Sequence, residues 1–339
     1  MTVQPATLER PKGSADLLVR LSADDMAAVD ALIRERCDSP VPLIPALAEH
    51  LIGAGGKRVR PMLTVAAARL SGGRYVTPDG PLKLAASVEF IHTATLLHDD
   101  VVDGSQLRRG KVAAHLIWGG ASSVLVGDFL FAGAFEMKVE AGSMRALDIL
   151  ARASRVIAEG EVLQLTRAHD LDLDKATYLQ IISAKTAELF AAAAESGAVV
   201  AGASDADAAS LRSYGMNLGL AFQLVDDALD YGGVSEVLGK NTGDDFREGK
   251  ATLPLILALQ RTGEREAAFW DRTVGKLKQE EGDFERARSL ILDSGALKAT
   301  LDLAQDYAEK AKADLAGFPA DDWRLSLEAL ADFTVSRAS

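Results

Sequence analysis

The stretch "EFIHTATLLHDDVVDG", residues 89 to 104, sets apolar residues three and four positions apart and then ends on aspartates and a glycine. Such spacing places the apolar side chains on one face of an α-helix. The same periodicity recurs, without strand-like alternation, in Ala- and Leu-rich segments at roughly 42–70, 80–103, 117–140, 143–168, 174–202 and 205–232, with further helices after about residue 251. The sequence therefore predicts an all-α bundle whose core holds any functional site.

Length and composition limit the classes of protein to consider. The 339 residues contain no Pro/Gly/Ser-rich linker, which predicts one domain over residues 21–339 after a poorly ordered tail, residues 1–20. A net charge of −12 provides no basic face for nucleic acid. The single cysteine, Cys37, excludes an internal disulfide and is typical of a reducing compartment. No apolar run resembles a leader or a membrane span, so we expect a cytoplasmic protein with no transmembrane segment.

Two groups of three aspartates share one spacing. The groups are Asp99, Asp100 and Asp103 in "HDDVVDG" (98–104), and Asp226, Asp227 and Asp230 in "VDDALDYGG" (225–233). In a helix the first and third aspartate of each group lie about one turn apart and point the same way. Each group ends a helix, where the macrodipole disfavours negative charge, so we expect bound cations at the two groups.

The ligand chemistry and the nearby basic residues indicate which cation and which substrate. Oxygen ligands that leave room for water and phosphate favour Mg²⁺ and a phosphorylated substrate. Basic residues stand close by in the sequence: Lys57, Arg58 and Arg60 in "GAGGKRVRP" (53–61), and Arg108, Arg109 and Lys111 in "QLRRGK" (106–111). The alternatives are solvated helix ends and exposed turns. Taken together, the two patterns predict Mg²⁺–diphosphate clamps plus a separate, metal-free anion site.

Four segments together resemble the trans-isoprenyl diphosphate synthases, especially the long-chain polyprenyl synthases that make quinone side chains. They are "GGKRVRP", "EFIHTATLLHDDVVDGSQLRRG", "AKTAEL" and "LGLAFQLVDDALD", in order from about residue 40 to beyond 250. The resemblance implies mainly antiparallel helices around a deep central cavity, with the two aspartate motifs facing each other across its mouth, usually in a homodimer. It also implies a prenyltransferase that condenses isopentenyl diphosphate repeatedly with an allylic diphosphate.

The resemblance assigns roles to individual residues. It implies that Mg²⁺ ions on the allylic diphosphate are held by Asp99, Asp100, Asp103, Asp226, Asp227 and Asp230. The residues that would contact the same diphosphate are Arg108, Lys185 and Lys240. Those that fall where the family binds isopentenyl diphosphate are Lys57, Arg60, His92 and Arg109, and Arg58 and Lys250 are grouped with the substrate-binding residues. Thr186 and Gln223 match positions that line the reacting carbons.

Several of these assignments have ordinary structural alternatives. His92 lies two turns below Asp99 on the same helical face, but a hydrogen-bonded core histidine fits there too. Lys185, in an alanine-rich helix, would by default be a surface lysine with a buried stem. Lys240 and Lys250 lie in a Gly-rich segment that we interpret as a lid over the site, with a plain solvated loop as the alternative.

Product length in the resembled family goes with the size of the residues four or five places before the first motif. Here these are Thr95 and Ala94, both small, which predicts a long all-trans product, octaprenyl to decaprenyl diphosphate. Phe131 and Phe135 of the following helix are candidates for the floor of the cavity. The alternatives are a shorter-chain farnesyl or geranylgeranyl synthase, a non-catalytic subunit of a heteromeric synthase, a class I terpene cyclase and a purely structural helical protein. A transient membrane contact could serve product release.

Overall fold

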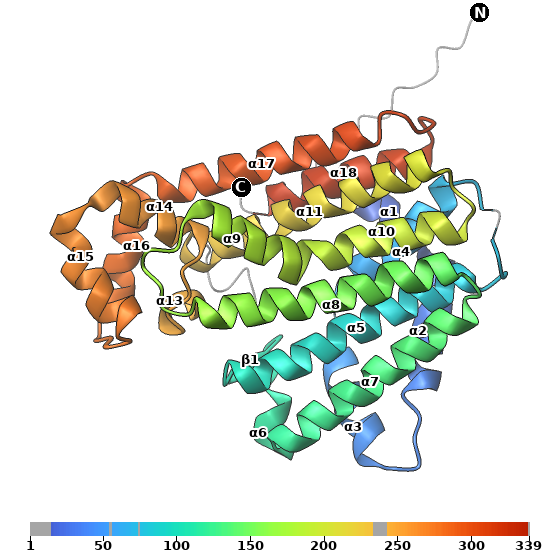
Figure 1. Cartoon of the computed structure of the whole chain (residues 1–339), viewed down its shortest axis with the longest axis horizontal. Helices are drawn as coiled ribbons and strands as arrows, with labels where there is room; N and C mark the ends of the chain where they lie inside the picture. Colours follow the sequence, from blue (N-terminus) through green and yellow to red (C-terminus); the bar gives the residue numbers. More distant parts are fainter. Residues whose placement is uncertain (1–14, 54–55, 74, 233–242, 338–339) are drawn as a thin grey trace, which may run out of the picture.

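The computed structural model describes residues 15–53, 56–73, 75–232 and 243–337, which form a bundle of helices (Figure 1). The first helices are α1 (Asp16–Leu21), α2 (Ala23–Arg36), α3 (Leu43–Ile52), α4 (Val59–Leu70), α5 (Gly80–Val102), α6 (Ala114–Trp118), α7 (Gly120–Glu140) and α8 (Met144–Thr166). A short antiparallel hairpin, β1 (Leu107–Arg108) and β2 (Lys111–Val112), lies between α5 and α6. The predicted all-α fold class is confirmed, with this hairpin as a small addition.

The remaining helices complete the bundle. They are α9 (Lys175–Ile182), the π-helical turn η1 (Ser183–Ala187), α10 (Glu188–Val200), α11 (Asp205–Gly232), α13 (Asp244–Arg247), α14 (Leu253–Thr262), α15 (Glu264–Trp270), the π-helical turn η2 (Asp271–Gly275), α16 (Asp283–Asp293), α17 (Ala296–Asp314) and α18 (Asp322–Ser336). Helices α17 and α18 run along one side of the bundle and α6 and α7 along the opposite side (Figure 1).

Helix α10 is the inner helix of the bundle and packs against α4, α5, α8 and α11. Its sequence, "ELFAAAAESGAVV", consists mostly of small residues, and nearly all of them are buried. Gly197 of α10 lies against the backbone of Thr64 in α4, and Gly215 of α11 lies against the carbonyl of Phe190, so that a Cβ atom at either glycine would clash. Small residues therefore bring the backbones of the inner helices into direct contact.

Two expected helices are divided in the structure. Segment 42–70 forms α3 and α4, because the glycine-rich connection after Gly53 ends the first helix and Arg58 adopts a left-handed backbone conformation, with φ at 47°. Segment 174–202 forms α9, η1 and α10 without a loop between them. Periodicity alone missed both interruptions, since apolar residues continue at helical spacing on each side of them.

The folded part of the chain begins earlier than expected. The sequence analysis assigned residues 1–20 to a tail, of which residues 1–14 lie outside the described residues. Residues 16–21 form α1, whose Leu18 is fully buried, and this helix packs against α2, α4 and α18. The predicted boundary at residue 21 is therefore wrong.

Helix α7 runs antiparallel to α5 and leaves its other side open. The Ser87 hydroxyl of α5 donates to the carbonyl of Ala134 over 3.0 Å, and His98, further along α5, lies 3.1 Å from the carbonyl oxygen of Val124. Such pairing is expected of helices that run in opposite directions. Toward α8, however, α7 borders an open groove of about 780 Å³. Among the described residues, α7 is the one helix long and apolar enough to cross a membrane by length and composition. The sequence analysis missed this apolar run, and its expectation of no transmembrane segment stays a prediction.

Lys138 of α7 is a buried cation without a carboxylate beside it. Its side chain is 1% exposed, and in the described part of the chain its Nζ atom has no hydrogen-bond partner. The Nζ atom lies 4.5 Å from the ring centroid of Phe135 and 5.9 Å from that of Phe131. Burial lowers the pKa of Lys138 to about 8.

We expect Lys138→Met to raise the free energy of unfolding by about 3–4 kcal/mol at pH 7, since its pKa is lowered from 10.5 to about 8 and each pKa unit corresponds to roughly 1.4 kcal/mol. Because the folded pKa lies below the unfolded value, the native state binds fewer protons between about pH 8 and pH 10. The loss of stability caused by the buried Lys138 ammonium group is therefore fully present below pH 8 and becomes smaller as the pH rises. Urea unfolding at pH 7 and pH 10 measures it, with exposed Lys310→Met as the control. A gain in stability that is equal at both pH values would contradict a buried ammonium.

Candidate active site

The C-terminal ends of α5 and α11, which carry the two aspartate groups, lie at the same end of the bundle, near β1, α9 and α13 (Figure 1). The π-helical turn η1 connects them. Its Lys185 lies 3.4 Å from Asp99 of the first group. The next residue, Thr186, donates a hydrogen bond to Gln223, which donates to Asp227 of the second group. Residues predicted from three separate segments are thus brought together by one turn of a type that is frequent at functional sites.

Each aspartate of the first group faces a cationic side chain. The pairs are Asp99 with Lys185 (3.4 Å), Asp100 with Arg108 (2.9 Å to Nε) and Asp103 with Lys250 (2.8 Å). Burial raises the pKa of Asp99 despite the nearby Lys185. Burial by itself would lower the pKa values of Arg108, Lys185 and Lys250, but the adjacent carboxylates outweigh it and raise them. These basic residues are therefore firmly charged.

Glu161 of α8 is a site residue that the sequence analysis missed. Its Oε2 atom lies 2.6 Å from Nζ of Lys185, so the lysine is held between two carboxylates. Burial raises the pKa of Glu161 to about 7, and the neighbouring Asp99 adds to the effect. The residue before it, Gly160, lets α8 approach η1, because a Cβ atom there would lie 2.9 Å from the backbone nitrogen of Lys185.

The three aspartates of the second group have different kinds of partner. Asp226 lies 3.4 Å from Arg337 at the C-terminal end of α18. Asp227 accepts hydrogen bonds from the Tyr178 hydroxyl and, over 2.7 Å, from the Gln223 amide. Asp230 accepts three backbone amides at the start of α13: those of Gly243 (3.1 Å), Asp244 (3.2 Å) and Asp245 (3.0 Å).

These partners separate the aspartates by their fitness to bind a metal ion. Asp99, Asp103 and Asp226 face long cationic side chains, which can move aside for a divalent cation. Asp100 also faces a cation, but it is 1% exposed and accepts two N–H groups of Arg108. Asp227, 3% exposed, and Asp230 already use their carboxylate oxygens within the protein. Among the described residues, no three His, Cys, Asp or Glu side chains gather closely enough to hold a metal ion by themselves. The donor set therefore fits Mg²⁺ only when diphosphate oxygens supply the rest of the shell.

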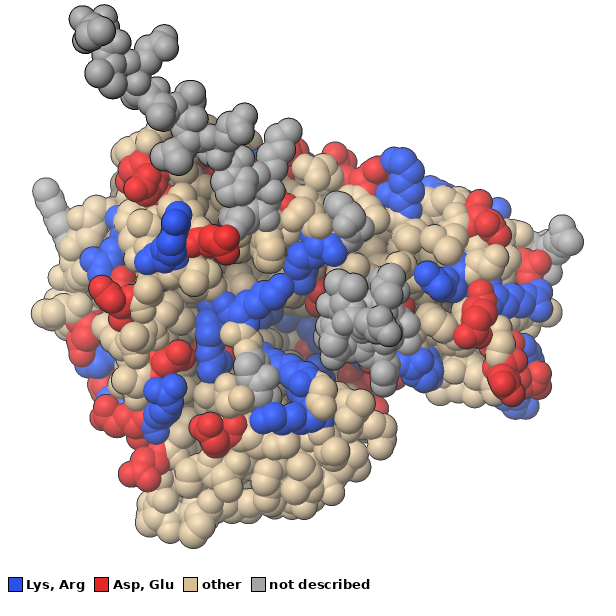
Figure 2. All heavy atoms as spheres, turned by 180° about the vertical axis from the view of Figure 1, so that it is seen from behind, with Lys and Arg blue, Asp and Glu red and all other residues tan. Residues whose placement is uncertain are grey.

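A second group of basic residues lies apart from the first aspartate group. Burial lowers the pKa of Arg60 to about 10, and its guanidinium stacks over Phe190 at 4.3 Å. Burial also lowers the pKa of His92 well below its usual value, and the positive charges of Arg60 and Arg109 add to this effect. Lys57 has a lowered pKa from burial and from Arg337. On the face shown in Figure 2, Lys and Arg side chains gather along a hollow. Cations that disfavour one another in this way form a site for an anion.

Arg58 does not belong to this second basic group. The Arg58 guanidinium forms an ion pair with Glu89, a carboxylate that is only 2% exposed. The same guanidinium lies 3.5 Å from Asp30 and donates a hydrogen bond to the carbonyl of Ile52 over 3.2 Å. Arg109, which the sequence analysis also assigned to substrate binding, lies against Gly56. The structure thus places Arg58 in an ion pair between α2, α4 and α5, and its expected contact with substrate is not supported.

The structure places one of the two predicted lid lysines at the site. Lys250 contacts Asp103 and therefore belongs to the first aspartate group, whereas Lys240 lies outside the described residues. The sequence analysis also missed Arg337 and Asp245. Burial, and next the nearby Asp230 and Asp227, raise the pKa of Asp245 well above its usual value. Arg337 reaches the site from the end of the chain, where no local pattern marked it, and Asp245 lies between Lys240 and Lys250 in the segment that the sequence analysis interpreted as a lid.

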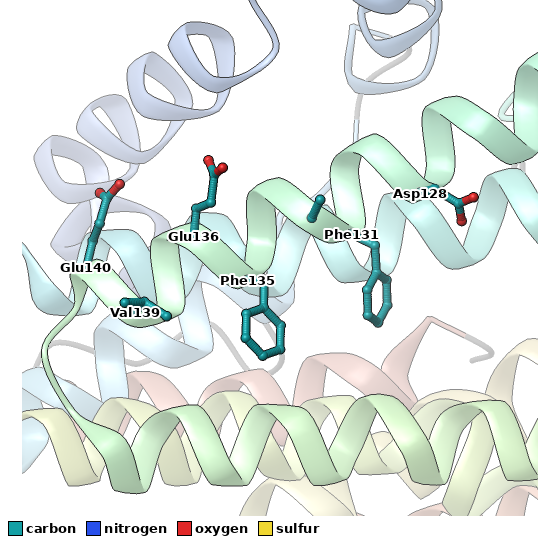
Figure 3. A pocket seen from close by; sticks show the side chains of 7 residues that line it. Asp128, Phe131, Phe135, Glu136, Val139 and Glu140 are labelled. Atoms are coloured by element: carbon teal, nitrogen blue, oxygen red, sulfur yellow. The ribbon is translucent and has the colours of Figure 1, made fainter.

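The predicted chain-length residues lie on two helices. The Thr95 hydroxyl donates to the His92 carbonyl over 2.8 Å, on the α5 face that leads to Asp99. Ala94 is fully buried. Phe131 and Phe135 point from α7 into the groove beside α8 (Figure 3), and Phe135 is 48% exposed. Their role as the floor of a cavity stays a prediction.

Comparison with known proteins identifies relatives along the whole chain. Residues 41–291 match the family described as "Polyprenyl synthetase". The chain is 45% identical over 324 residues to the octaprenyl diphosphate synthase of Escherichia coli (strain K12), covering 94% of this chain and 97% of that protein. It is similar to the crystal structure of a polyprenyl synthase from Caulobacter crescentus CB15 complexed with calcium and isoprenyl diphosphate, with a TM-score of 0.93, 71% identity and coverage of 97% of this chain and 100% of that one. For a decaprenyl diphosphate synthase from Rhodobacter capsulatus the TM-score is 0.91, with 52% identity and coverage of 96% and 100%. The resemblance inferred from the motifs is confirmed.

We expect Arg58→Met to lower the free energy of unfolding by about 3 kcal/mol, because it leaves the buried Glu89 carboxylate without its partner. Lys57→Ala, at the exposed neighbouring residue, should change stability little. In the double variant Arg58→Met/Glu89→Leu most of the loss should be recovered, since no unpaired charge remains. Chemical denaturation of the four chains measures these values. An Arg58→Met chain as stable as the wild type would contradict the structural role.

Proposed function

The chain belongs to the polyprenyl synthetase family, and we propose that it is a trans-polyprenyl diphosphate synthase. It condenses isopentenyl diphosphate repeatedly with an allylic diphosphate to give an all-trans product of octaprenyl to decaprenyl length, for the side chain of a quinone. The observation that carries this proposal is a pair of charged groups of residues at one end of the bundle, which we interpret as two separate anion sites. One has carboxylates paired with cations, and the other is a group of mutually repelling basic residues around Arg60.

The first site suits the allylic diphosphate. Asp99, Asp103 and Asp226 would hold Mg²⁺ together with diphosphate oxygens, and the metal would supply charge neutralisation on the departing diphosphate. Arg108, Lys185 and Lys250 add fixed positive charge, with Lys240 assigned on the family resemblance alone. Asp100, Asp227 and Asp230 hold Arg108, Gln223 and the start of α13 in place.

The second site suits isopentenyl diphosphate. Its residues are Lys57, Arg60, His92, Arg109 and Arg337. An anion bound there would offset the burial and, to a smaller extent, the nearby positive charges that lower the pKa values of Lys57 and Arg60. His92, kept neutral by burial and by its basic neighbours, can donate a hydrogen bond to a phosphate oxygen without requiring a further proton.

The chemistry follows from these two bound anions. The allylic C–O bond breaks, and its electron pair leaves with the diphosphate, whose growing charge the basic residues stabilise. The double bond of isopentenyl diphosphate then attacks the allylic carbocation, and the proton lost from the adduct goes to the released diphosphate. Thr186 and Gln223 present polar oxygen atoms beside the reacting carbons. No protein nucleophile is needed, but the apolar cavity must exclude water from the carbocation.

Other functions agree less well with the two anion sites. A terpene cyclase has one diphosphate to bind and no use for the group around Arg60. A non-catalytic subunit would have no need of paired carboxylates and cations at the first site. A shorter-chain synthase would be expected to have a bulky residue beneath the first motif, where Thr95 and Ala94 are small.

A homodimer in the cytoplasm is part of the proposal. Exposed apolar side chains gather on α6 and α7: Leu116, Ile117, Val124, Leu125, Phe135 and Val139. The lower part of the face in Figure 2 carries few charged side chains. A patch of this kind suits a second copy of the chain, and product release could involve a transient membrane contact. Light scattering during size-exclusion chromatography, which gives the mass in solution, tests the dimer.

We expect the purified chain alone, with Mg²⁺, to incorporate radiolabelled isopentenyl diphosphate and farnesyl diphosphate into an extractable lipid. Asp99→Ala should nearly abolish incorporation, because it removes a carboxylate from the metal-binding set. The exposed Asp306→Ala on α17 is the matched control and should keep wild-type activity. Incorporation that requires a second polypeptide would favour the subunit alternative, and an Asp99→Ala chain with near-wild-type rate would contradict the metal assignment.

Mass spectrometry of the product tests the predicted length. We expect wild-type products of octaprenyl to decaprenyl size and sharply shorter ones from Thr95→Phe, since the ring would fill the space one turn below Asp99. Leu292→Phe, which adds a ring on the exposed side of α16, is the control and should leave the products unchanged. A wild-type product of farnesyl or geranylgeranyl size would refute the long-chain proposal.

A further inference from the structure

One face of α11 is built around a four-residue repeat: Gly215, Gly219, Gln223 and Asp227. The two glycines bring α11 against α10 and η1, and a Cβ atom on Gly219 would lie 2.5 Å from Cα of Ala187. On the other side, a Cβ atom on Gly160 of α8 would lie 2.7 Å from Cβ of Ala184. The π-helical turn η1 therefore packs between Gly160 of α8 and Gly219 of α11. These two contacts fix the backbone positions of Lys185 and Thr186.

The polar half of this repeat forms a chain of hydrogen bonds. The Thr186 hydroxyl donates to the Gln223 carbonyl oxygen over 2.8 Å, and the Gln223 amide nitrogen donates to Oδ1 of Asp227 over 2.7 Å. The other oxygen of Asp227, Oδ2, accepts the hydroxyl of Tyr178. Tyr178 belongs to α9, six residues before the quoted motif "AKTAEL" begins, and is 3% exposed.

The direction of each hydrogen bond follows from Asp227. A carboxylate only accepts hydrogen bonds, so the amide nitrogen of Gln223 must face it and the amide oxygen must face Thr186. Thr186 then has to donate, and the lone pairs of its oxygen are left for the reacting carbons. This order requires both oxygens of Asp227 to stay where they are. Gln223 secures only one of them.

We infer that Tyr178 is a positioning residue: its hydroxyl anchors the second oxygen of Asp227 and thereby fixes the orientation of Gln223 and Thr186 at the reacting carbons. Without that anchor, Asp227 can turn away from Gln223, whose amide then loses the acceptor that orients it and can turn over; the Thr186 proton, instead of its lone pairs, would then point into the site. The role rests on the proposed function. It concerns the rate of the chemical step and not the binding of either diphosphate, since Tyr178 reaches the predicted anion sites only through Asp227, whose two oxygens are already used within the protein.

The test compares Tyr178→Phe, Thr186→Ala and the double variant. We expect Tyr178→Phe to lower kcat about tenfold or more, with KM for both diphosphates and the Mg²⁺ requirement within about twofold of wild type. If Tyr178 acts through Thr186, the double variant will be no slower than Thr186→Ala alone. A general loss of packing would instead add its own decrease in the Thr186→Ala background.

Tyr214→Phe is the matched control. It also removes a buried tyrosine hydroxyl with one hydrogen bond, here to the carbonyl of Leu327 over 2.7 Å, but it lies away from the polar chain. It should lose similar thermal stability and keep its kcat. An unchanged kcat in Tyr178→Phe, additive losses in the double variant, or a main effect on KM or on the Mg²⁺ requirement would overturn the role. A wild-type chain that makes no lipid product overturns the proposed function itself, so the two failures are distinguishable.

Discussion

Two groups of carboxylates lie at helix C-termini at the same end of the bundle, where the members of each group repel one another and face the negative end of a helix dipole. Each carboxylate is compensated in its own way: by lysines and an arginine at the first group, and by a tyrosine, an amide and backbone N–H groups at most of the second. The rest of the fold serves to bring these partners in. Removing them would leave a cluster of buried charges that the bundle could not hold.

The direction of the pKa shifts divides the basic residues into two sets. Those beside the first aspartate group have raised pKa values, because carboxylates already stabilise their charge. Those around Arg60 have lowered pKa values, because burial and like charges destabilise theirs. Under the proposed function, the first set would bind a metal ion and a diphosphate together, and the second set would bind an anion without a metal ion.

Close packing of glycine and alanine makes this arrangement stiff. Helices α8, α10 and α11 approach until their backbones touch, and the π-helical turn lies between them. A site built on such contacts has little freedom to relax when a charged substrate arrives or leaves, which suits a reaction that passes through a reactive carbocation. Bulkier inner residues would separate the helices and move Lys185 and Thr186 away from the two aspartate groups.

The sequence by itself determined the helical class, most helix positions and the location of both aspartate groups, because helical periodicity and the spacing of residues one turn apart are local properties. It also indicated the basic segments, but not which member of each would face the site. Arg58 and Arg60 are two residues apart, yet only the packing of α4 on α5 sends the first to Glu89 and the second toward His92. Arg337 reaches Asp226 from 111 residues away, and Glu161 and Tyr178 find their partners on neighbouring helices. These contacts depend on how the helices are rotated against one another. That rotation depends on contacts between helices, such as those of Gly160 and Gly215, whose partners a single sequence does not identify.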